Sequence, residues 1–156
     1  MIIRRATLDD ADAICELHVR SIRELCAADY TPAQVEAWAG RKRPALYREA
    51  MTDGGETMFV AVDDGGDRVI GFVAFKEAEI YGLYVAPESV RRGAGSELLD
   101  AAEAAMRLAG VTQVKFRSTL TALSFYLRRG YQRGDDAIAR MSGVEIPCVW
   151  MSKTLQ

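Results

Sequence analysis

Histidine and cysteine are scarce in this chain of 156 residues, which contains one histidine and three cysteines. Cys15, Cys26 and Cys148 lie far apart and are odd in number, which predicts buried free thiols rather than a disulfide framework. His18 alone cannot complete a structural zinc site with them. The composition therefore argues against the disulfide-stapled and zinc-module classes of protein, and we expect no bound metal.

Long apolar runs are missing as well. No stretch reaches the roughly 18 consecutive apolar residues that a membrane-spanning helix needs. Met1–Thr7 lacks the apolar core and the small-residue cleavage site of a secretory signal. We therefore expect a cytoplasmic protein that does not bind a membrane, and the length fits one domain over residues 1–156.

Blocks of like charge are also absent. The 20 basic and 22 acidic residues are interspersed and give a formal net charge of −2. Binding of nucleic acid usually requires a continuous basic stripe, so no nucleic-acid partner is expected. Basic pairs occur only locally, at Arg4-Arg5, Arg91-Arg92 and Arg128-Arg129. This pattern favours a small anionic ligand.

Apolar periodicity and turn residues predict the order of strands and helices. A strand at residues 2–6 leads into a helix capped by Thr7–Asp10, and a second helix starts at Thr31–Gln34, is interrupted near Gly40 and restarts around Pro44. Further segments are expected as strands at 57–62, 68–78, 79–85, 112–118, 131–141 and 144–153, and as helices after residue 96 and over 121–129. The order β-α-α-β-β-β-α-β-α-β-β predicts an α/β fold of the mixed α+β type. Its central mixed, mostly antiparallel sheet should have about seven strands, with helices on both faces.

The segment LYVAPESVRRGAGSELL, residues 83–99, combines the end of a strand, a glycine-bearing turn and the start of a helix. Free backbone N–H groups and the positive end of the helix dipole then face the same point, which predicts an anion site. Gly93 and Gly95 lack the Cβ atoms that would keep a diphosphate from the backbone, and Arg91 and Arg92 add positive charge. The segment lacks the lysine and the following Ser/Thr of a nucleotide P-loop, and it also lacks the spacing of a dinucleotide fingerprint.

This segment resembles the signature of the GNAT superfamily of N-acetyltransferases, Gln/Arg-x-x-Gly-x-Gly/Ala after a strand ending in Leu-Tyr-Val-x-Pro. The similarity extends to residues 2–7, 122–131 and 143–153 and covers nearly the whole chain. Val90 departs from the signature, at a position where the family contributes largely a backbone amide. The resemblance implies a GNAT-type fold and acetyl-CoA (coenzyme A) as cosubstrate. It places the cofactor-binding residues at Leu83, Tyr84, Val85, Val90, Arg91, Arg92, Gly93, Ala94, Gly95, Ser96, Thr119 and Tyr126.

The resemblance also implies two catalytic side chains. An alkylammonium of pKa near 10.4 is neutral in only about one part in a thousand at pH 7, so the acceptor amine needs a base. The acidic residue that the family often carries on this strand corresponds to Glu79, and Glu77 is the second candidate. The alternative is that Glu79 is only a solvated carboxylate at the end of the strand. A bulge near Gly82 would change which residues lie on the same face of the strand as Glu79. Tyr126 corresponds to the general acid for the leaving thiolate, and the alternative is an aromatic packing residue. The amide near Leu83 would polarise the acetyl carbonyl.

The acceptor of the resembling family enters opposite the coenzyme, against the first two helices and the last hairpin. Candidate substrate-binding residues are His18, Ser21, Tyr30 and Trp38, each of which could instead be structural. We expect an N-acetyltransferase that moves the acetyl group of acetyl-CoA directly to a primary amine of a small molecule. The alternatives are acetylation of a protein N-terminus or lysine, and a non-catalytic acyl-CoA sensor. Family members often form homodimers, and the sequence leaves this open.

Overall fold

The computed structural model describes all 156 residues. Its elements confirm the expected order of strands and helices, including the interrupted helix, which appears as α2 and α3. The elements are β1 (Ile2–Arg5), α1 (Ala11–Leu25), α2 (Pro32–Ala39), α3 (Pro44–Met51), β2 (Thr57–Val62), β3 (Val69–Lys76), β4 (Glu79–Val85), α4 (Ala94–Leu108), β5 (Gln113–Thr119), α5 (Leu123–Arg128), β6 (Gln132–Met141) and β7 (Val144–Thr154). None of the helices is both long and apolar enough to span a membrane.

Local capping explains where the N-terminal helices begin. Thr31 Oγ1 accepts from the N–H of Gln34 at 3.2 Å, and Gln34 Oε1 accepts from the N–H of Thr31 at 2.9 Å, while Pro32 occupies the first turn. Before α1, Asp10 Oδ2 accepts from the N–H of Thr7 at 2.7 Å, and the N–H of Asp10 donates to Thr7 O at 3.0 Å. These reciprocal bonds satisfy N–H groups that a helix start leaves without partners, and a cap of this kind typically contributes about 1 kcal/mol.

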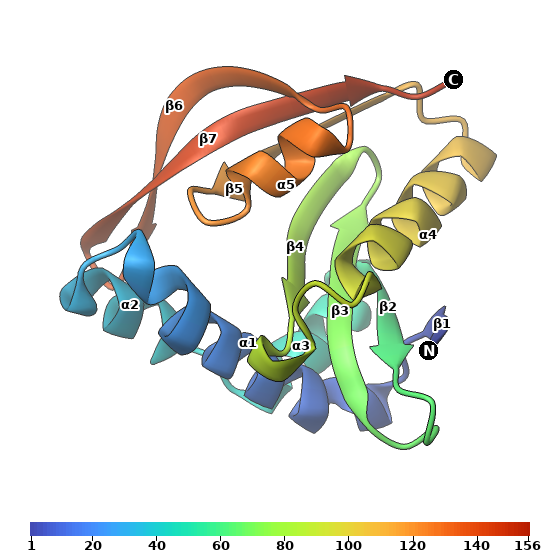
Figure 1. The fold of residues 1–156 in the computed structure, drawn as a ribbon, viewed down its shortest axis with the longest axis horizontal. Helices are drawn as coiled ribbons and strands as arrows, with labels where there is room; N and C mark the ends of the chain where they lie inside the picture. Colours follow the sequence, from blue (N-terminus) through green and yellow to red (C-terminus); the bar gives the residue numbers. More distant parts are fainter.

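The strands form two antiparallel sheets that meet at β4 and β5 (Figure 1). The first sheet has the order β1-β2-β3-β4 and the second the order β5-β7-β6. Lys115 N at the start of β5 donates to Ala78 O, just before β4, at 3.0 Å. No ladder continues this contact, so the two strands begin together and then separate. The separation leaves backbone groups of both strands without a strand partner.

A bulge in β4 sets which side chains face which helix layer. Ala74 pairs with Gly82 but Phe75 pairs with Ile80, so Tyr81 is an extra residue. Because of it, Glu79 lies on the same face of the sheet as Gly82 and Tyr84 rather than on the face of Leu83. The sequence left open a regular strand, which would place Glu79 on the face of Leu83, and a bulge near Gly82; the structure has the bulge, at Tyr81.

Helices cover both faces of the first sheet, as expected (Figure 1). On one face α4 buries Leu98, Leu99 and Met106 in a cluster that reaches into both sheets. On the other face α1 and α3 pack on β2 and β3 through a second cluster, which includes Ile14 and Phe72. A third cluster joins α2 to the β6–β7 hairpin. All three cysteines are buried and free.

Candidate active site

The turn between β4 and α4 exposes a run of backbone donors. Residues 90–96 donate none of their backbone N–H groups to a carbonyl of the protein. Arg91 has φ of 64° and Gly93 has φ of 87°, and these left-handed residues shape the turn into a concave nest of N–H groups. A Cβ built on Gly93 would meet no protein atom within 4 Å, so it would point into open space. Orphan amides at the start of a 15-residue helix are suited to an anion such as a diphosphate.

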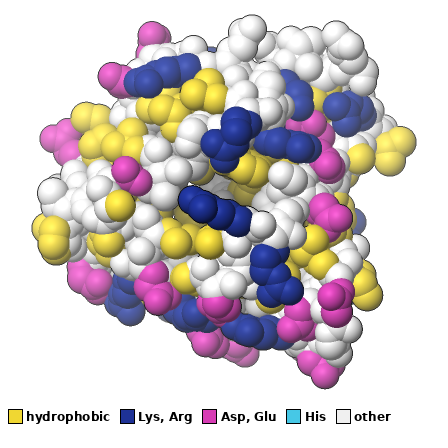
Figure 2. Space-filling model, in the orientation of Figure 1, with side chains coloured by type: hydrophobic (Ala, Val, Ile, Leu, Met, Phe, Trp, Pro, Cys, Tyr) yellow, Lys and Arg dark blue, Asp and Glu magenta, His cyan; other side chains and the backbone are white.

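A cavity of about 620 Å³ opens in front of this turn. Figure 2 shows the face as a hollow surrounded by Lys and Arg side chains. Its walls come from α1, β4, the turn, the β5–α5 loop and α5. The lining residues are Ser21, Leu25, Cys26, Leu83, Tyr84, Val85, Ser89, Val90, Arg91, Gly93, Ala94, Gly95, Ser96, Thr119, Thr121, Ala122, Phe125, Tyr126, Arg128 and Arg129. The volume suits a ligand of cofactor size.

Most of the cofactor-binding residues expected from the sequence come together in this cavity. The exception is Arg92, which does not line it. The N-terminal ammonium, and to a smaller degree Arg92, lowers the pKa of Asp64 in the β2–β3 loop, so Arg92 lies toward that loop. Arg91 and Arg128 line the cavity without a carboxylate partner, whereas Arg129 pairs with an aspartate of α4. The cavity rim therefore keeps uncompensated positive charge.

Alternate residues of β4 direct their backbone N–H and C=O groups toward the cavity. Ala86 N donates to Ile70 O on β3 at 2.8 Å. In an antiparallel pair this fixes the alternation, so Tyr84 directs its backbone groups to β3 while Leu83 and Val85 direct theirs away from it. On that side β5 has separated from β4, so these N–H and C=O groups border the cavity. They can pair with an extended ligand as a neighbouring strand would.

Tyr126 lies where the large cavity meets a smaller one of about 30 Å³ between β4 and β5. Its side chain is buried, and its ring packs edge-on against Phe116 at 4.7 Å and Tyr131 at 5.5 Å between centroids. The Tyr131 hydroxyl donates to Glu103 at 2.8 Å, but the Tyr126 hydroxyl has no hydrogen-bond partner in the protein. Burial raises the pKa of Tyr126, so the phenol stays protonated. A fixed, neutral and unpaired hydroxyl is suited to donate a proton.

Tyr30 and Trp38, two candidate acceptor residues, are buried and line neither cavity. The Tyr30 hydroxyl donates to Pro147 O at 2.7 Å and accepts from Leu120 N at 2.9 Å. It thereby ties the turn before α5 to β7. The ring of Trp38 packs against Tyr30 at 5.4 Å and Tyr84 at 6.4 Å between centroids. Both residues support the walls of the site.

His18 lies behind Tyr84, with 4.0 Å between the ring centroids. His18 Nδ1 is 2.7 Å from Tyr47 Oη, and its buried Nε2 has no partner. Burial lowers the pKa of His18 well below its ordinary value, so the ring is neutral. His18 lines neither cavity, whereas Ser21, one turn further along α1, lines the larger one.

Glu79 begins β4 and lines neither cavity, although Tyr81, two residues further on, lines the smaller one. Partial burial raises the pKa of Tyr81 first, and the Glu79 carboxylate raises it further, so the two side chains interact. Glu79 therefore lies near Tyr81 but is not itself among the residues that line the smaller cavity.

The sequence interpretation missed several lining residues, among them Leu25, Cys26 and Ser89. Leu25 and Cys26 follow Ser21 and Ile22 at four-residue spacing, so they continue the inner face of α1 toward the cavity, although neither is among the candidate site residues expected from the sequence. Ser89 is buried, and its hydroxyl has no partner. Nothing in the sequence distinguishes it from an ordinary turn serine.

Known proteins resemble the chain over most of its length. The acetyltransferase (GNAT) domain family matches residues 26–155. The uncharacterized N-acetyltransferase YafP of Escherichia coli K12 is 26% identical over 130 residues, covering 83% of this chain and 80% of its relative. The spermidine N(1)-acetyltransferase of Thermoplasma acidophilum is 25% identical over 143 residues, which cover 85% of this chain and 89% of that relative.

A solved structure agrees in fold over almost the entire chain. The GCN5-related N-acetyltransferase from Rhodopseudomonas palustris superposes with a TM-score of 0.91 at 28% identity. The match covers 99% of this chain and 95% of the other. A crystallised N-acetyltransferase therefore shares the fold of this chain.

Proposed function

The chain belongs to the acetyltransferase (GNAT) family and is an acetyl-CoA-dependent N-acetyltransferase, and from this we propose that it acetylates the primary amine of a small molecule directly. The observation that carries the proposal is the cavity of about 620 Å³, which joins the unpaired amides of the turn to the unpaired Tyr126 hydroxyl. One end suits a diphosphate and the other suits proton transfer. Both ends of the required chemistry thus share one continuous space.

The residues of the cavity fit acetyl-CoA, which supplies the acetyl group as a thioester. The N–H groups of residues 90–96 would hold the diphosphate, with Arg91 and Arg128 adding charge-assisted bonds. The outward backbone groups of Leu83 and Val85 would pair with the amides of the pantetheine arm. This arrangement uses the unpaired N–H groups of residues 90–96 and the outward backbone groups of Leu83 and Val85.

Three groups of the chain would then serve the transfer. Glu79, through water, accepts the proton that the ammonium loses, and the neutral nitrogen forms a bond to the acetyl carbon. The Leu83 N–H stabilises the negative charge that develops on the carbonyl oxygen. As the bond from carbon to sulfur breaks, Tyr126 donates its proton to the leaving thiolate. The nitrogen loses a second proton as the amide forms, and this proton restores Tyr126. Glu79 releases the first proton to solvent, so the chain returns to its starting state.

Direct transfer is favoured over an acetyl-cysteine intermediate. Cys26 lines the cavity, but burial raises the pKa of its thiol, so it is protonated at neutral pH. His18, the sole histidine, is buried behind Tyr84 and lines neither cavity. Without a base to form the thiolate, Cys26 is a poor nucleophile.

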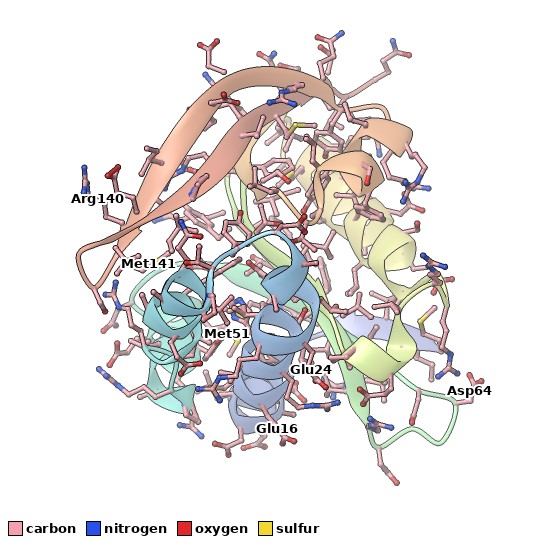
Figure 3. The ribbon with its side chains drawn as sticks, turned by 60° about the vertical axis from the view of Figure 1, so that its left-hand side comes forward. Glu16, Glu24, Met51, Asp64, Arg140 and Met141 are labelled. Carbon is pink, nitrogen blue, oxygen red and sulfur yellow. The ribbon has the colours of Figure 1, made fainter.

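A small acceptor is supported by contacts that close the acceptor side of the molecule. The β6–β7 hairpin packs on α2 through an apolar cluster, and Met141 lies at the end of β6 beside α2 (Figure 3). Gln34 of α2 donates to Glu145 O at 2.9 Å, and Tyr30 donates to Pro147 O at 2.7 Å. An extended peptide would need an open groove between α2 and the hairpin, which these contacts fill.

A screen of primary amines with acetyl-CoA, measured by release of coenzyme A thiol and by the mass of the product, tests the proposal. We expect a small amine to give a product 42 Da heavier, since acetylation replaces one hydrogen by an acetyl group, at a rate proportional to enzyme concentration. Peptides with free N-termini or lysines serve as the competing class. Acetylation of peptides alone would refute the small-molecule assignment, and saturable binding of acetyl-CoA without any turnover would indicate a sensor.

A further inference from the structure

Two cations on β5 face the same side as Trp150 of β7. Side chains alternate along β5, so Phe116 and Ser118 are buried while Lys115 and Arg117 are exposed on the opposite face. Arg117 pairs in register with Trp150. Lys115 Nζ is 5.0 Å and Arg117 Cζ is 5.9 Å from the centroid of the Trp150 ring. The indole thus holds both cations over one patch of the second sheet.

Neither cation has a carboxylate partner, in contrast to arginines such as Arg23, which pairs with Glu36 at 2.9 Å. Arg117 also lines the smaller cavity together with Gly82 and Tyr126. A residue whose guanidinium has no carboxylate partner therefore borders the space between β4 and β5 where the proposed reaction takes place. Across the smaller cavity from Arg117, Gly82 lets the Tyr84 ring pack close to β4, since a Cβ at Gly82 would lie only 3.2 Å from that ring.

Carboxylates lie near Tyr81, which lines the smaller cavity between β4 and β5. Partial burial raises the pKa of Tyr81 most, and the carboxylates of Glu79, Glu56 and Glu77 raise it further. Lys76 lies near Glu56 and partly offsets it, but Glu77 and Glu79 have no ion-pair partner. The bond from Lys115 N to Ala78 O fixes the relative position of the two strands and brings Glu79 beside the start of β5. Unpaired charge of both signs thus lies near the smaller cavity.

We infer that the acceptor is an amino acid, a molecule with a carboxylate as well as the primary amine that is acetylated; this rests on the proposed function. Arg117 binds the acceptor's carboxylate through paired N–H donors, with Lys115 adding charge, and the ammonium lies toward Glu79. The ammonium groups of a polyamine would pair with the carboxylates near the smaller cavity, but Arg117 and Lys115 would repel its second positive charge. A zwitterion satisfies both charges at once.

The test compares amino acids with the corresponding amines that lack the carboxylate, and adds spermidine as a polyamine. kcat and KM are measured by thiol release for the unmodified protein, for Arg117→Gln and for Arg5→Gln. Arg5 is an exposed arginine of β1 without an ion pair, so it controls for loss of one positive charge. Thermal unfolding checks that each variant is folded.

We expect amino acids to be the better acceptors. Arg117→Gln should raise their KM by about 10- to 100-fold, the loss expected for a charged hydrogen-bonded contact, while KM for acetyl-CoA is unchanged. Arg5→Gln should change neither value. If amines without a carboxylate are preferred and Arg117→Gln leaves KM for every amino acid unaltered, the inference is wrong while the proposed function stands. If no amine of any kind is acetylated, both fail.

Discussion

Replacement of Tyr126 by phenylalanine separates chemistry from folding more cleanly than any other change in the site. The hydroxyl makes no hydrogen bond in the protein, and the ring contacts with Phe116 and Tyr131 remain in the variant. The free energy of unfolding should therefore change by less than about 0.5 kcal/mol. If Tyr126 is the general acid, kcat should fall by about 10²- to 10⁴-fold, because the thiolate must leave without a positioned proton donor.

Tyr131→Phe is the matched control, since its ring lies 5.5 Å from that of Tyr126 and it also loses one hydroxyl. The Tyr131 hydroxyl donates to the buried Glu103 carboxylate at 2.8 Å, and in the variant Glu103 would keep Lys153 at 3.1 Å and Arg107 at 3.6 Å as charged partners. Losing a buried bond to a charged group costs about 1–3 kcal/mol, which lowers Tm by roughly 2–12 °C in a chain of this size. We expect kcat of this control variant to stay within about twofold of kcat of the unmodified protein.

The assay is thiol release at saturating amine over a range of acetyl-CoA concentrations, beside thermal unfolding of each variant. KM for acetyl-CoA should be unchanged in Tyr126→Phe, because the hydroxyl is proposed to act on the leaving group rather than in binding. Full retention of kcat by Tyr126→Phe would remove Tyr126 from the acid role. An equal loss of kcat in both variants would mean that the aromatic cluster supports the site by packing alone.

Two further predictions concern residues that support the walls of the site. Burial lowers the pKa of His18 in the folded state, so the unfolded chain binds the proton at a higher pH than the folded chain does. The free energy of unfolding should therefore fall by up to about 1.4 kcal/mol per pH unit as the pH drops below 6.5. A His18→Gln variant should lack this slope in chemical denaturation, and an unchanged slope would assign it to another group. Tyr30→Phe removes the hydrogen bonds to Pro147 and Leu120 and should lower the free energy of unfolding by about 1–3 kcal/mol, measured by urea titration. An unchanged free energy of unfolding would mean that these bonds do not stabilise the fold.

Local signals in the sequence were sufficient for the order of elements and for the anion-binding turn. Thr31, Pro32 and Gln34 encode a helix start within four residues, and the glycines after Pro87 encode the turn before α4. In each case the determining bonds join neighbours in the chain. Such features depend little on the rest of the fold, which is why sequence reasoning identifies them.

Features that depend on distant partners could not be predicted in the same way. The bulge at Tyr81 exists only in the pairing of β3 with β4, and it moves Glu79 to the other face. The Tyr30 hydroxyl contacts Pro147, which is 117 residues away in the chain. Arg91 and Arg92 are identical in type, and only the backbone path of the turn decides that Arg91 lines the cavity. Long-range packing therefore decided where Glu79 and Tyr30 lie, and the local path of the turn decided which of the two arginines lines the cavity.

The central claim is that the cavity in front of the β4–α4 turn holds acetyl-CoA, and thermal unfolding with acetyl-CoA, coenzyme A or ATP tests it most directly. At about 100 times Kd, ligand binding should add about 2.7 kcal/mol, or roughly 5–11 °C in Tm. We expect this shift with both coenzyme A species but not with ATP, and its loss in Gly93→Val. Gly143→Val is the control, because Gly143 in the β6–β7 turn has a similar φ of 78° and equally open surroundings. No shift of the unmodified protein at millimolar ligand, or an equal shift in both variants, would contradict the assignment.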